Sequence, residues 1–506
     1  MGALTGLVAR VRDPRFDRVL LFGWIAMFSI ARAGRFEERD PYWQVRAGAE
    51  NLSGAPLVRP DTWSWSGIPG DWYQNSAGWN DVLATCYRIA GYWGIFALTA
   101  LLIAGYLLLA ASLGRRFGAR PLPGMAGMVV LIAGSLSMLS PRATLVVQVL
   151  ILAAVALADV WAGRWAMTVP VWANALAALV VAGVLSALGN WAHLSFLTMS
   201  PVLAAVWAFL WLLSPLGVAR RAGLIAGGTI GWLGGLLASP YGLALGLERT
   251  RIVQEVCAGL ILEWSSPFQP GMDPKAVTAV VVGVALALVM AWWLLARLRA
   301  GRRCASEPAL LALALFGIPA TLASLWAVRF LGIGLLTAAP VVALAASEGV
   351  VAARRWFASR PPTRWAEYSE GRFWRPVLAA VTLLLLPGAV WLGSQHAVPA
   401  EQELVDQLPA GCRLMNSQTV AGPVILSRPD VKVWIDGRAD FYGRAHIEDT
   451  YAYYLATNSA LVPPGTSCVL LQNDYGLPMA KAMAASPDWR LAVRQGQFEL
   501  YLPARG

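Results

Sequence analysis

Long apolar runs separated by short arginine-bearing segments fill most of the first 395 residues of the chain. An α-helix needs roughly 17–25 predominantly apolar residues to cross a bilayer. Runs of this kind lie near 17–34, 91–113, 123–140, 143–162, 168–188, 194–213, 222–239, 276–298, 308–327, 330–352 and 375–393. The pattern therefore predicts an α-helical polytopic membrane protein of about eleven transmembrane helices.

The pattern changes after residue 396, where charges return and the apolar runs shorten. Stretches 412–417, 431–436, 467–473 and 497–503 are typical of strands, and 443–457 and 476–486 are typical of helices. Strands that alternate with helices favour a small α/β domain with a largely parallel sheet. We therefore divide the chain into a membrane domain, 1–395, and a C-terminal α/β domain, 396–506.

Composition and charge support a multi-pass protein of the plasma membrane. Of 506 residues, 57% are hydrophobic and 14% are charged, whereas a soluble domain carries about a quarter charged residues. The net charge of +11 comes from arginines that cluster in alternate loops, which is the positive-inside pattern, so we expect no nucleic-acid partner. That pattern places the N-terminus in the cytoplasm and the C-terminal domain outside the cell.

Two of the expected outer loops are long, 35–90 and 240–275, and long loops in compact domains are usually functional. The first follows "SIARAG", which is similar to a signal-peptide cleavage site. We favour an uncleaved anchor because an acidic motif begins so soon afterwards. Within this loop, the Trp- and Tyr-bearing stretches 41–53 and 78–90 predict short helices at the membrane–water interface.

The acidic motif consists of Glu37, Glu38 and Asp40. Three carboxylates close together near a membrane should raise the pKa of at least one of them. Such a group suits a general base, and with a second carboxylate such as Asp61 it also suits a divalent cation (Mg, Mn or Ca). The alternative is that Asp40 only caps a helix that has Pro41 in its first turn.

Around Asp40 the chain reads D-x-x-W-x-x-R-x-G, with Trp43, Arg46 and Gly48, and is followed by "PDTWSW" at 60–65. This resembles the first outer loop of bacterial membrane proteins of the GT-C superfamily, the polyprenyl-phosphate-sugar-dependent glycosyltransferases. Gln44 stands where that family often has His. Further similar stretches are "NWAHLSF" (190–196), "SPYG" (239–242), "EWSSP" (263–267), "RFLG" (329–332) and "WIDGRADFYG" (434–443), whereas 417–426 departs from the family pattern.

The resemblance implies a GT-C fold and a role for Asp40 as catalytic base or metal ligand. It also implies contacts between substrate and the Trp43, Arg46, Glu263 and Trp264 positions.

Arg142, Arg329 and His193 fall on the outer side of the expected topology. An arginine on that side needs an anionic partner. The phosphate of a lipid-linked sugar would serve because the guanidinium fork matches phosphate oxygens. A structural pair of Arg142 with Asp40 or Glu263 would serve equally. His193 suits phosphate binding or leaving-group protonation, and equally a helix-end position.

Asp436, Arg438 and Asp440 follow a predicted strand, and ligands collect at strand ends in open α/β sheets. Salt bridges within the domain are one interpretation of this motif. Acceptor binding, or docking of the domain over a membrane cavity, is the other.

Cys412 and Cys468 lie in predicted strands on the oxidising side, so a disulfide between them is an open alternative to two free thiols. The remaining Cys86, Cys257 and Cys304 are interpreted as small apolar residues. The sequence contains no C-x-x-C metal motif.

Together these observations predict a glycosyltransferase that moves a sugar from a polyprenyl-phosphate donor to an extracytoplasmic glycan, lipid or protein acceptor, with inversion and with Asp40 as base. One alternative is a non-catalytic relative that binds lipid-linked glycans or scaffolds envelope assembly. A lipid or glycan transporter is less favoured because span centres carry few ionisable residues.

Overall fold

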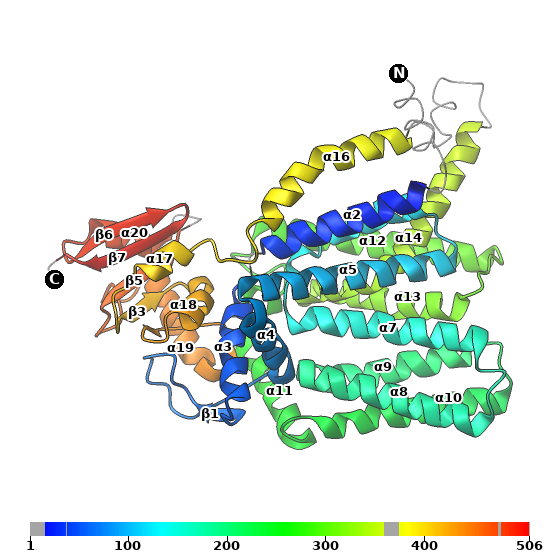
Figure 1. Ribbon diagram of the computed structural model, residues 1–506, viewed down its shortest axis with the longest axis horizontal. Coiled ribbons are helices and arrows are strands. Elements are labelled where there is room, and N and C mark those ends of the chain that lie inside the picture. Colours follow the sequence, from blue (N-terminus) through cyan, green and yellow to red (C-terminus); the bar gives the residue numbers. More distant parts are fainter. Residues whose placement is uncertain (1–15, 37, 359–373, 474–476, 505–506) are drawn as a thin grey trace.

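The computed structural model describes residues 16–36, 38–358, 374–473 and 477–504. Long helices run side by side in a bundle, and a small α/β domain sits at one end of it (Figure 1). We call that end the outer end. The bundle helices are α2 (Phe16–Gly34), α5 (Tyr92–Phe117), α6 (Pro121–Ala133), α7 (Ala143–Arg164), α8 (Val171–Ala192), α9 (Phe196–Leu212), α10 (Val218–Gly234), α12 (Pro274–Arg299), α13 (Glu307–Leu322), α14 (Arg329–Ala358) and α16 (Trp374–Gly393).

Each of the eleven expected apolar runs overlaps one of these helices. Among the described residues, seven helices are long and apolar enough to cross a membrane, or eight if the bent pair of α10 and α11 forms one span. The three remaining bundle helices, α2, α6 and α9, do not meet this criterion because they carry more charge or are shorter. Helix α2 carries Asp17, Arg18 and Arg32 within 19 residues, α6 has 13 residues and α9 has 17.

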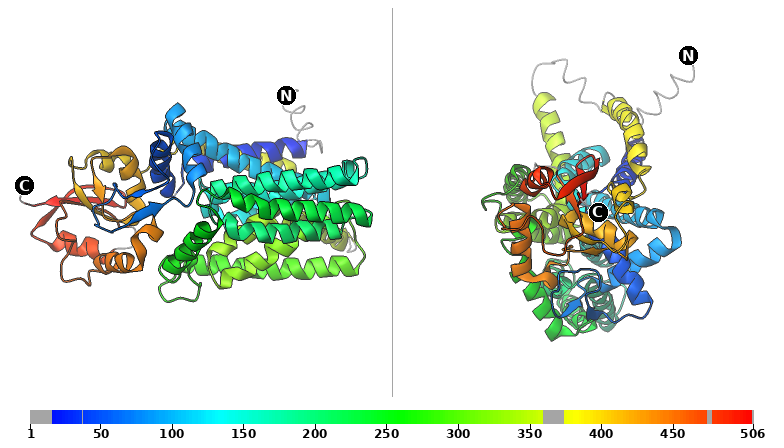
Figure 2. Two further views of the ribbon diagram at one scale, coloured as in Figure 1. Left: turned by 90° about the horizontal axis from the view of Figure 1, so that it is seen from below. Right: turned by 90° about the vertical axis from the view of Figure 1, so that its left-hand side faces the viewer.

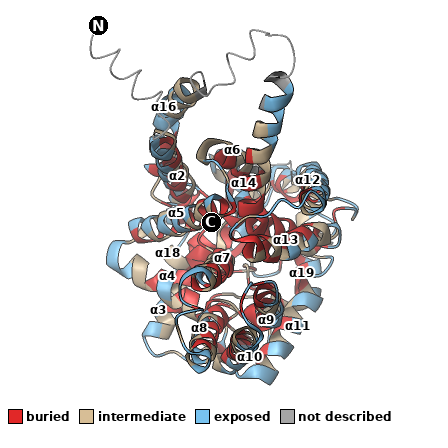
Figure 3. Cartoon of the chain, turned by 90° about the vertical axis from the view of Figure 1, so that its right-hand side faces the viewer, coloured by how far each residue is buried: buried red, intermediate tan, exposed pale blue. Residues whose placement is uncertain are grey.

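The apolar core of the bundle gathers around α7, α13 and α14, whereas few residues of α12 and α16 are buried (Figure 3). Helices α5, α7 and α12 begin at the outer end and finish in arginine-bearing turns at the opposite end (Figure 1). The basic residues of these helices therefore lie at the end opposite the α/β domain.

The first outer loop contains two short helices and a hairpin. Helices α3 (Asp40–Leu52) and α4 (Ala77–Ala90) match the two helices expected there. Strands β1 (Val58–Pro60) and β2 (Asp71–Tyr73) pair antiparallel between them and were not expected. The close crossing of α3 and α4 depends on Gly48, where a Cβ would lie 2.0 Å from the Asn80 carbonyl oxygen.

The second outer loop is mostly helical. Helix α11 (Leu243–Cys257) turns by 81° from the direction of α10. It packs against α19 (Ala439–Tyr454) of the C-terminal domain, and a short 3₁₀ turn, η3 (Leu262–Trp264), follows it. Figure 2 shows α11 at the junction between the bundle and the C-terminal domain.

The C-terminal domain has one five-stranded sheet in the order β4-β3-β5-β7-β6. The central strand β5 (Cys468–Gln472) pairs parallel with β3 (Arg413–Asn416), which pairs parallel with β4 (Lys432–Val433). Strand β7 (Phe498–Pro503) pairs antiparallel with β5, and β6 (Trp489–Gln495) pairs antiparallel with β7. The expectation of a largely parallel sheet is therefore wrong for the part of the sheet formed by β7 and β6. Strand β6 was not expected from the sequence, and it is an edge strand with no buried residue, in which Arg490 and Arg494 interrupt the apolar positions.

The expected helices match α19 and α20 (Pro478–Ala485), whereas α17 (Gln402–Asp406) and α18 (Ala421–Ser427) were not expected. Cys412 and Cys468 form a disulfide, with their Cα atoms 6.2 Å apart.

The first outer loop is built into the C-terminal domain. Trp43, Trp63 and Trp72 belong to the same buried apolar cluster as the strands of that domain. Segment 63–65 lies alongside β4: the Trp65 amide donates to the Val433 carbonyl at 3.0 Å, and the Val433 amide donates to the Trp63 carbonyl at 3.0 Å. Loop and domain therefore form one structural unit, although more than 300 residues of sequence separate them.

Candidate functional site

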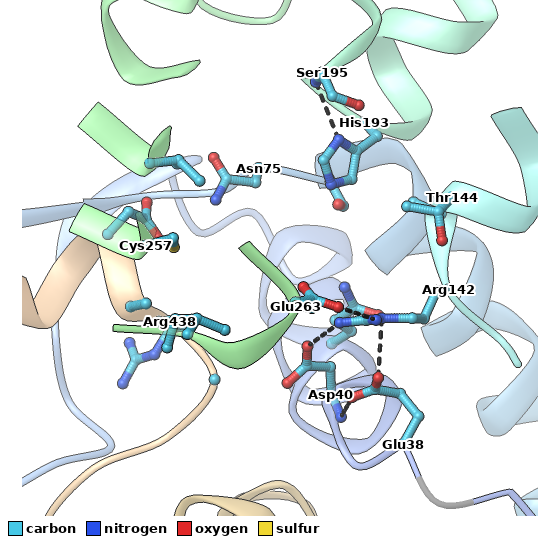
Figure 4. A pocket seen from close by; sticks show the side chains of 18 of the residues that line it. Glu38, Asp40, Asn75, Arg142, Thr144, His193, Ser195, Cys257, Glu263 and Arg438 are labelled. Atoms are coloured by element: carbon cyan, nitrogen blue, oxygen red, sulfur yellow. Dashed lines mark hydrogen bonds and ion pairs between the residues drawn. The ribbon is translucent and has the colours of Figure 1, made fainter. Parts of the chain in front are cut away.

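A cavity of about 470 Å³ lies where the outer ends of the helices, both outer loops and the C-terminal domain meet. Helix α3, the start of α7, the turn after α8, helix α11, η3, the start of α14 and the 437–440 segment all contribute to its wall. Figure 4 shows its charged side chains converging from these elements.

Asp40 is held at the first residue of α3, but it does not cap the helix. Glu38 does this instead, because its Oε1 accepts from the backbone amides of Arg39 (3.1 Å) and Asp40 (3.2 Å). Pro41 occupies the first turn, as the sequence suggested. The Asp40 carboxylate is therefore free to face the cavity, where its Oδ1 accepts a hydrogen bond from Trp43 Nε1 at 2.9 Å.

Arg142 contacts three carboxylates, Glu38 and Asp40 at the start of α3 and Glu263 in η3 (Figure 4). Its Nε lies 3.0 Å from Glu38 Oε2, its Nη2 lies 3.4 Å from Asp40 Oδ2, and its Nη1 lies 3.3 Å from Glu263 Oε2. All five guanidinium N–H donors point from one planar group, so a single arginine can serve several acceptors at once. Of the two roles open to Arg142, the structure shows the ion pair with both Asp40 and Glu263.

Around Arg142, the pKa values of Asp40 and Glu263 shift in opposite directions. Burial and the neighbouring Glu38 raise the pKa of Asp40 to about 7, against the opposing effects of Arg142 and the Trp43 hydrogen bond. Burial also raises the pKa of Glu263, but Arg142 and Arg329 outweigh it and hold that pKa below its usual value. Asp40 is therefore poised to exchange a proton near neutral pH, whereas Glu263 stays ionised.

Arg329, the first residue of α14, is a cation without a carboxylate partner in the described part of the chain. Its side chain forms no ion pair and no hydrogen bond there, and its Cζ lies 3.7 Å from the centre of the Trp264 ring. Both residues line the cavity. A guanidinium held over an aromatic face with its N–H groups unused can bind an anion.

His193 follows the end of α8 and lines the same cavity. Burial lowers its pKa to about 3, and the nearby Arg329 and Arg142 act in the same direction. Its Nδ1 accepts from the Ser195 amide at 3.0 Å, which assigns the proton to Nε2. The ring is therefore a neutral donor, suited to hydrogen-bond an anion and unsuited to protonate a leaving group.

Asp61 lies away from Asp40. Its carboxylate accepts from the Trp63 and Ser64 amides at 3.1 and 3.0 Å and pairs with Arg438 Nη1 at 2.8 Å, and it does not line the cavity. Within the described ranges, no three His, Cys, Asp or Glu side chains are placed to hold a metal ion. These residues do not fit a divalent cation shared by Asp40 and Asp61, and Glu37 lies outside the described residues.

Asp436 and Arg438 form a buried ion pair, and Arg438 also pairs with Asp61; we call these three residues the clasp. Arg438 Nη2 lies 2.6 Å from Asp436 Oδ2, and Tyr442 donates to the same oxygen at 2.8 Å. Since Arg438 also pairs with Asp61, it ties the C-terminal domain to the first outer loop. Asp440 lines the cavity and makes no ion pair among the described residues, and burial raises its pKa to about 6. Of the three, Asp440 alone presents a free carboxylate to the cavity.

Of the remaining residues expected to bind substrate, some line the cavity and one does not. Trp43 and Trp264 line the cavity, whereas Arg46 does not; it pairs with Glu50 one turn further along α3, with Nε and Oε1 2.7 Å apart. Gln44 was given no role from the sequence. It is 7% exposed, it lines the cavity, and its Oε1 has no hydrogen-bond partner among the residues that the structure describes. Its spacing of four residues from Asp40 on a helix was the available signal.

Asp159 and Glu348, which lie near the opposite end of the bundle, both have charged partners. Asp159 bonds Arg116 and accepts from Ser306 Oγ at 3.0 Å. Glu348 bonds Arg297 and lies 3.2 Å from Arg302 Nη2. Neither is the unpaired carboxylate that would be expected where a transporter binds its driving ion.

Comparisons with known proteins agree with this architecture. No protein-family model and no curated protein matches the chain. Among solved structures, apo ArnT from Cupriavidus metallidurans is similar at 13% identity and a TM-score of 0.54, covering 97% of this chain and 98% of that one. The form of ArnT bound to undecaprenyl phosphate has 13% sequence identity and a TM-score of 0.50, and the match covers 96% of this chain and 98% of that one.

An Archaeoglobus fulgidus oligosaccharyltransferase has 12% sequence identity and a TM-score of 0.49, and the match covers 90% of this chain and 69% of that one. The likeness to ArnT confirms the expected fold, a helical membrane domain with a C-terminal α/β domain.

Proposed function

We propose that this protein is a membrane glycosyltransferase that moves a sugar from a polyprenyl-phosphate donor to a hydroxyl-bearing acceptor on the extracytoplasmic side. The proposal places the outer end, with the C-terminal domain, outside the cell and the arginine-rich helix ends in the cytoplasm. The observation that carries it is the presence, in one cavity, of an uncommitted arginine and a separate carboxyl that titrates near neutrality.

Arg329 and His193 are the proposed phosphate site. Arg329 offers unused N–H groups, and His193 offers a neutral Nε2–H on the same cavity wall. Together they stabilise the charge that builds on the phosphate as it leaves. The shared fold with ArnT, which has been solved with undecaprenyl phosphate bound, supports a polyprenyl carrier here.

Asp40 is the proposed base. Its carboxylate takes the proton of the acceptor O–H, and the acceptor oxygen forms a bond to the anomeric carbon of the sugar. The bond between that carbon and the phosphate oxygen breaks, and polyprenyl phosphate leaves with the electron pair. One displacement inverts the anomeric centre and requires no covalent intermediate.

Arg142 has a different role in this scheme. Because it is shared among Glu38, Asp40 and Glu263, it keeps the acids together and limits the rise in the pKa of Asp40. The base is therefore partly ionised at neutral pH and still basic enough to accept a proton.

The test uses the full chain in nanodiscs with undecaprenyl-phosphate sugars as donors and a membrane glycolipid extract as acceptor. Native protein should form a new glycosidic bond, and Asp40→Asn should abolish it while undecaprenyl phosphate still binds. Binding without transfer in the native protein would favour the non-catalytic alternative. Movement of label across liposomes without a new bond would favour a transporter.

A further inference from the structure

The segment Asp436–Gly437–Arg438 of the C-terminal domain lies directly on Asp40. A Cβ at Gly437 would be 2.1 Å from Asp40 Oδ1, 3.0 Å from its Cγ and 2.9 Å from Trp43 Nε1. The φ angle of Gly437 is not in the left-handed region, so its backbone conformation does not require glycine. A side chain at this position would therefore require the Asp40 carboxylate and the Trp43 indole to move.

This segment is fixed at both ends. On one side Asp436, fully buried, accepts from the Arg438 amide at 2.9 Å. On the other, the Arg438 guanidinium pairs with Asp61 of the first outer loop, and its Cζ lies 4.5 Å from the ring centre of Trp63 and 4.9 Å from that of Trp72. Gly437 therefore cannot withdraw from Asp40 unless the clasp opens.

A second close approach joins the same surfaces. A Cβ at Gly422, in α18, would lie 2.1 Å from the Arg39 carbonyl oxygen at the start of α3. Arg39 also makes a two-pronged ion pair with Glu401 of the C-terminal domain, at 2.7 and 3.1 Å. The helix that carries Asp40 is thus held by the C-terminal domain at its first turn.

We propose that Gly437 is a positioning residue, through which the C-terminal domain covers the Asp40 carboxylate and fixes it against Trp43, so that the site is complete only while this domain is docked. The inference rests on the proposed role of Asp40 as base. It gives the domain a part in the chemistry of the membrane domain and not only in acceptor binding.

The charged groups that face Asp40 are Glu38, Arg142 and Glu263, and Arg438 lies beyond Gly437 with its charge already paired. None of these groups is changed when Gly437 is replaced. A methyl group at this position would push the carboxylate away from Trp43 and admit water. Loss of the Trp43 hydrogen bond raises the pKa of Asp40, whereas contact with water lowers it. Because burial is the largest cause of the raised pKa, the second effect is the larger, and the carboxylate ionises more easily than in the native protein.

Labelling with dicyclohexylcarbodiimide tests the proposal, because this apolar reagent modifies carboxyl groups in their protonated form. Full-length protein in nanodiscs is labelled across a pH series, and the peptide that contains Asp40 is quantified by mass spectrometry. In the native protein, labelling should fall to half near pH 7. In Gly437→Ala the midpoint should fall by about one pH unit or more.

Gly105→Ala is the matched control, because Gly105 lies in α5 with no other atom within 4 Å of its Cβ position. Its labelling curve should match that of the native protein. Should Gly437→Ala fail to fold, Asp61→Asn, which loosens the clasp and leaves Asp40 untouched, should shift the midpoint in the same direction. Undecaprenyl phosphate binding should be unchanged in either folded variant.

Folded variants whose labelling curves coincide with the native curve would overturn the proposal. The readout needs no sugar substrate. Sugar transfer that survives Asp40→Asn would end the proposed function but leave the labelling result intact, so the two failures are distinguishable.

Discussion

The guanidinium of Arg329 lies 3.7 Å from the ring centre of Trp264, facing a cavity whose other arginines have carboxylate or carbonyl partners. The indole holds the cation in place without neutralising it. A phosphate that enters the cavity therefore meets one arginine that does not have to break an existing ion pair. The proposed donor site depends on this difference between Arg329 and Arg142.

Arg329→Gln should weaken undecaprenyl phosphate binding by roughly 10–100-fold, because a charged hydrogen bond contributes about 1.5–3 kcal/mol. Arg329→Lys should recover part of that loss, since it keeps the charge but not the planar fork. Equilibrium binding in nanodiscs, with undecaprenol as the uncharged comparison, measures this effect. Arg251→Gln, on an exposed pair of α11, is the control; an equal loss there would remove Arg329 from the phosphate site.

His193→Phe should weaken the same binding by about tenfold or less, because it removes one hydrogen bond from a neutral donor, worth about 0.5–1.5 kcal/mol. Since the pKa of His193 is lowered to about 3, the affinity of the native protein should show no titration near pH 6.5 that His193→Phe abolishes. Binding measured between about pH 5.5 and pH 8 decides this. A histidine-dependent rise in affinity on acidification would show that the imidazole becomes charged.

Transfer activity should depend on pH through Asp40. Its pKa is raised to about 7, and the base acts as the carboxylate, so kcat/KM should rise with pH and level off above about pH 7. Because the folded-state pKa is above the unfolded value, ionised Asp40 reduces stability increasingly as pH rises towards 7. Asp40→Asn should therefore be inactive yet no less heat-stable at about pH 8, as measured by thermal unfolding.

Sequence reasoning found the residues of the cavity more reliably than it found their partners. Asp40, Arg142, His193, Glu263 and Arg329 all line it, because each sits at a helix end or in a loop on the side opposite the basic clusters. Topology alone brings such residues together. Whether Arg142 binds phosphate or carboxylates depends on distances of a few tenths of an ångström, which no spacing in the sequence encodes.

The contacts that the sequence could not supply are long-range. Asp61 and Arg438 pair across 377 positions, and Gly437 reaches Asp40 across a similar separation. Both need the first outer loop to join the C-terminal domain, which no local pattern signals. Glu38 was noticed as one acid among three, but its capping of α3, which frees Asp40, is a matter of backbone geometry.

The disulfide between Cys412 and Cys468 should stabilise the C-terminal domain by about 2–4 kcal/mol. The double variant Cys412→Ala/Cys468→Ala should therefore lower the unfolding temperature and speed cleavage of that domain in limited proteolysis. Cys86→Ala, at a free cysteine in α4, is the control. Equal protease resistance in both proteins would show that the sheet does not depend on the bond.

Removing Arg142 should have the largest effect of any single change in the cavity. Arg142→Ala leaves Glu38, Asp40 and Glu263 without their common counter-ion, and breaking a buried pair costs about 3–5 kcal/mol. The pKa of Glu263 is held down mainly by Arg142, so the stability from this pair is present above the unfolded pKa and lost as pH falls. In the variant the unpaired buried acids take up protons more easily, so the drop in unfolding temperature should be larger at about pH 8 than at about pH 4.5, where these acids lose their charge.

Arg142→Lys separates charge from geometry in the same experiment. It should restore part of the stability at about pH 8, because a cation remains among the three acids, but a single ammonium cannot reach all of them as the fork does. Millimolar Mn²⁺ should raise the unfolding temperature of Arg142→Ala more than that of the native protein, since three unpaired carboxylates then compete for a cation. A pH-independent loss, with no response to Mn²⁺, would mean that Arg142 acts through packing and not through its charge.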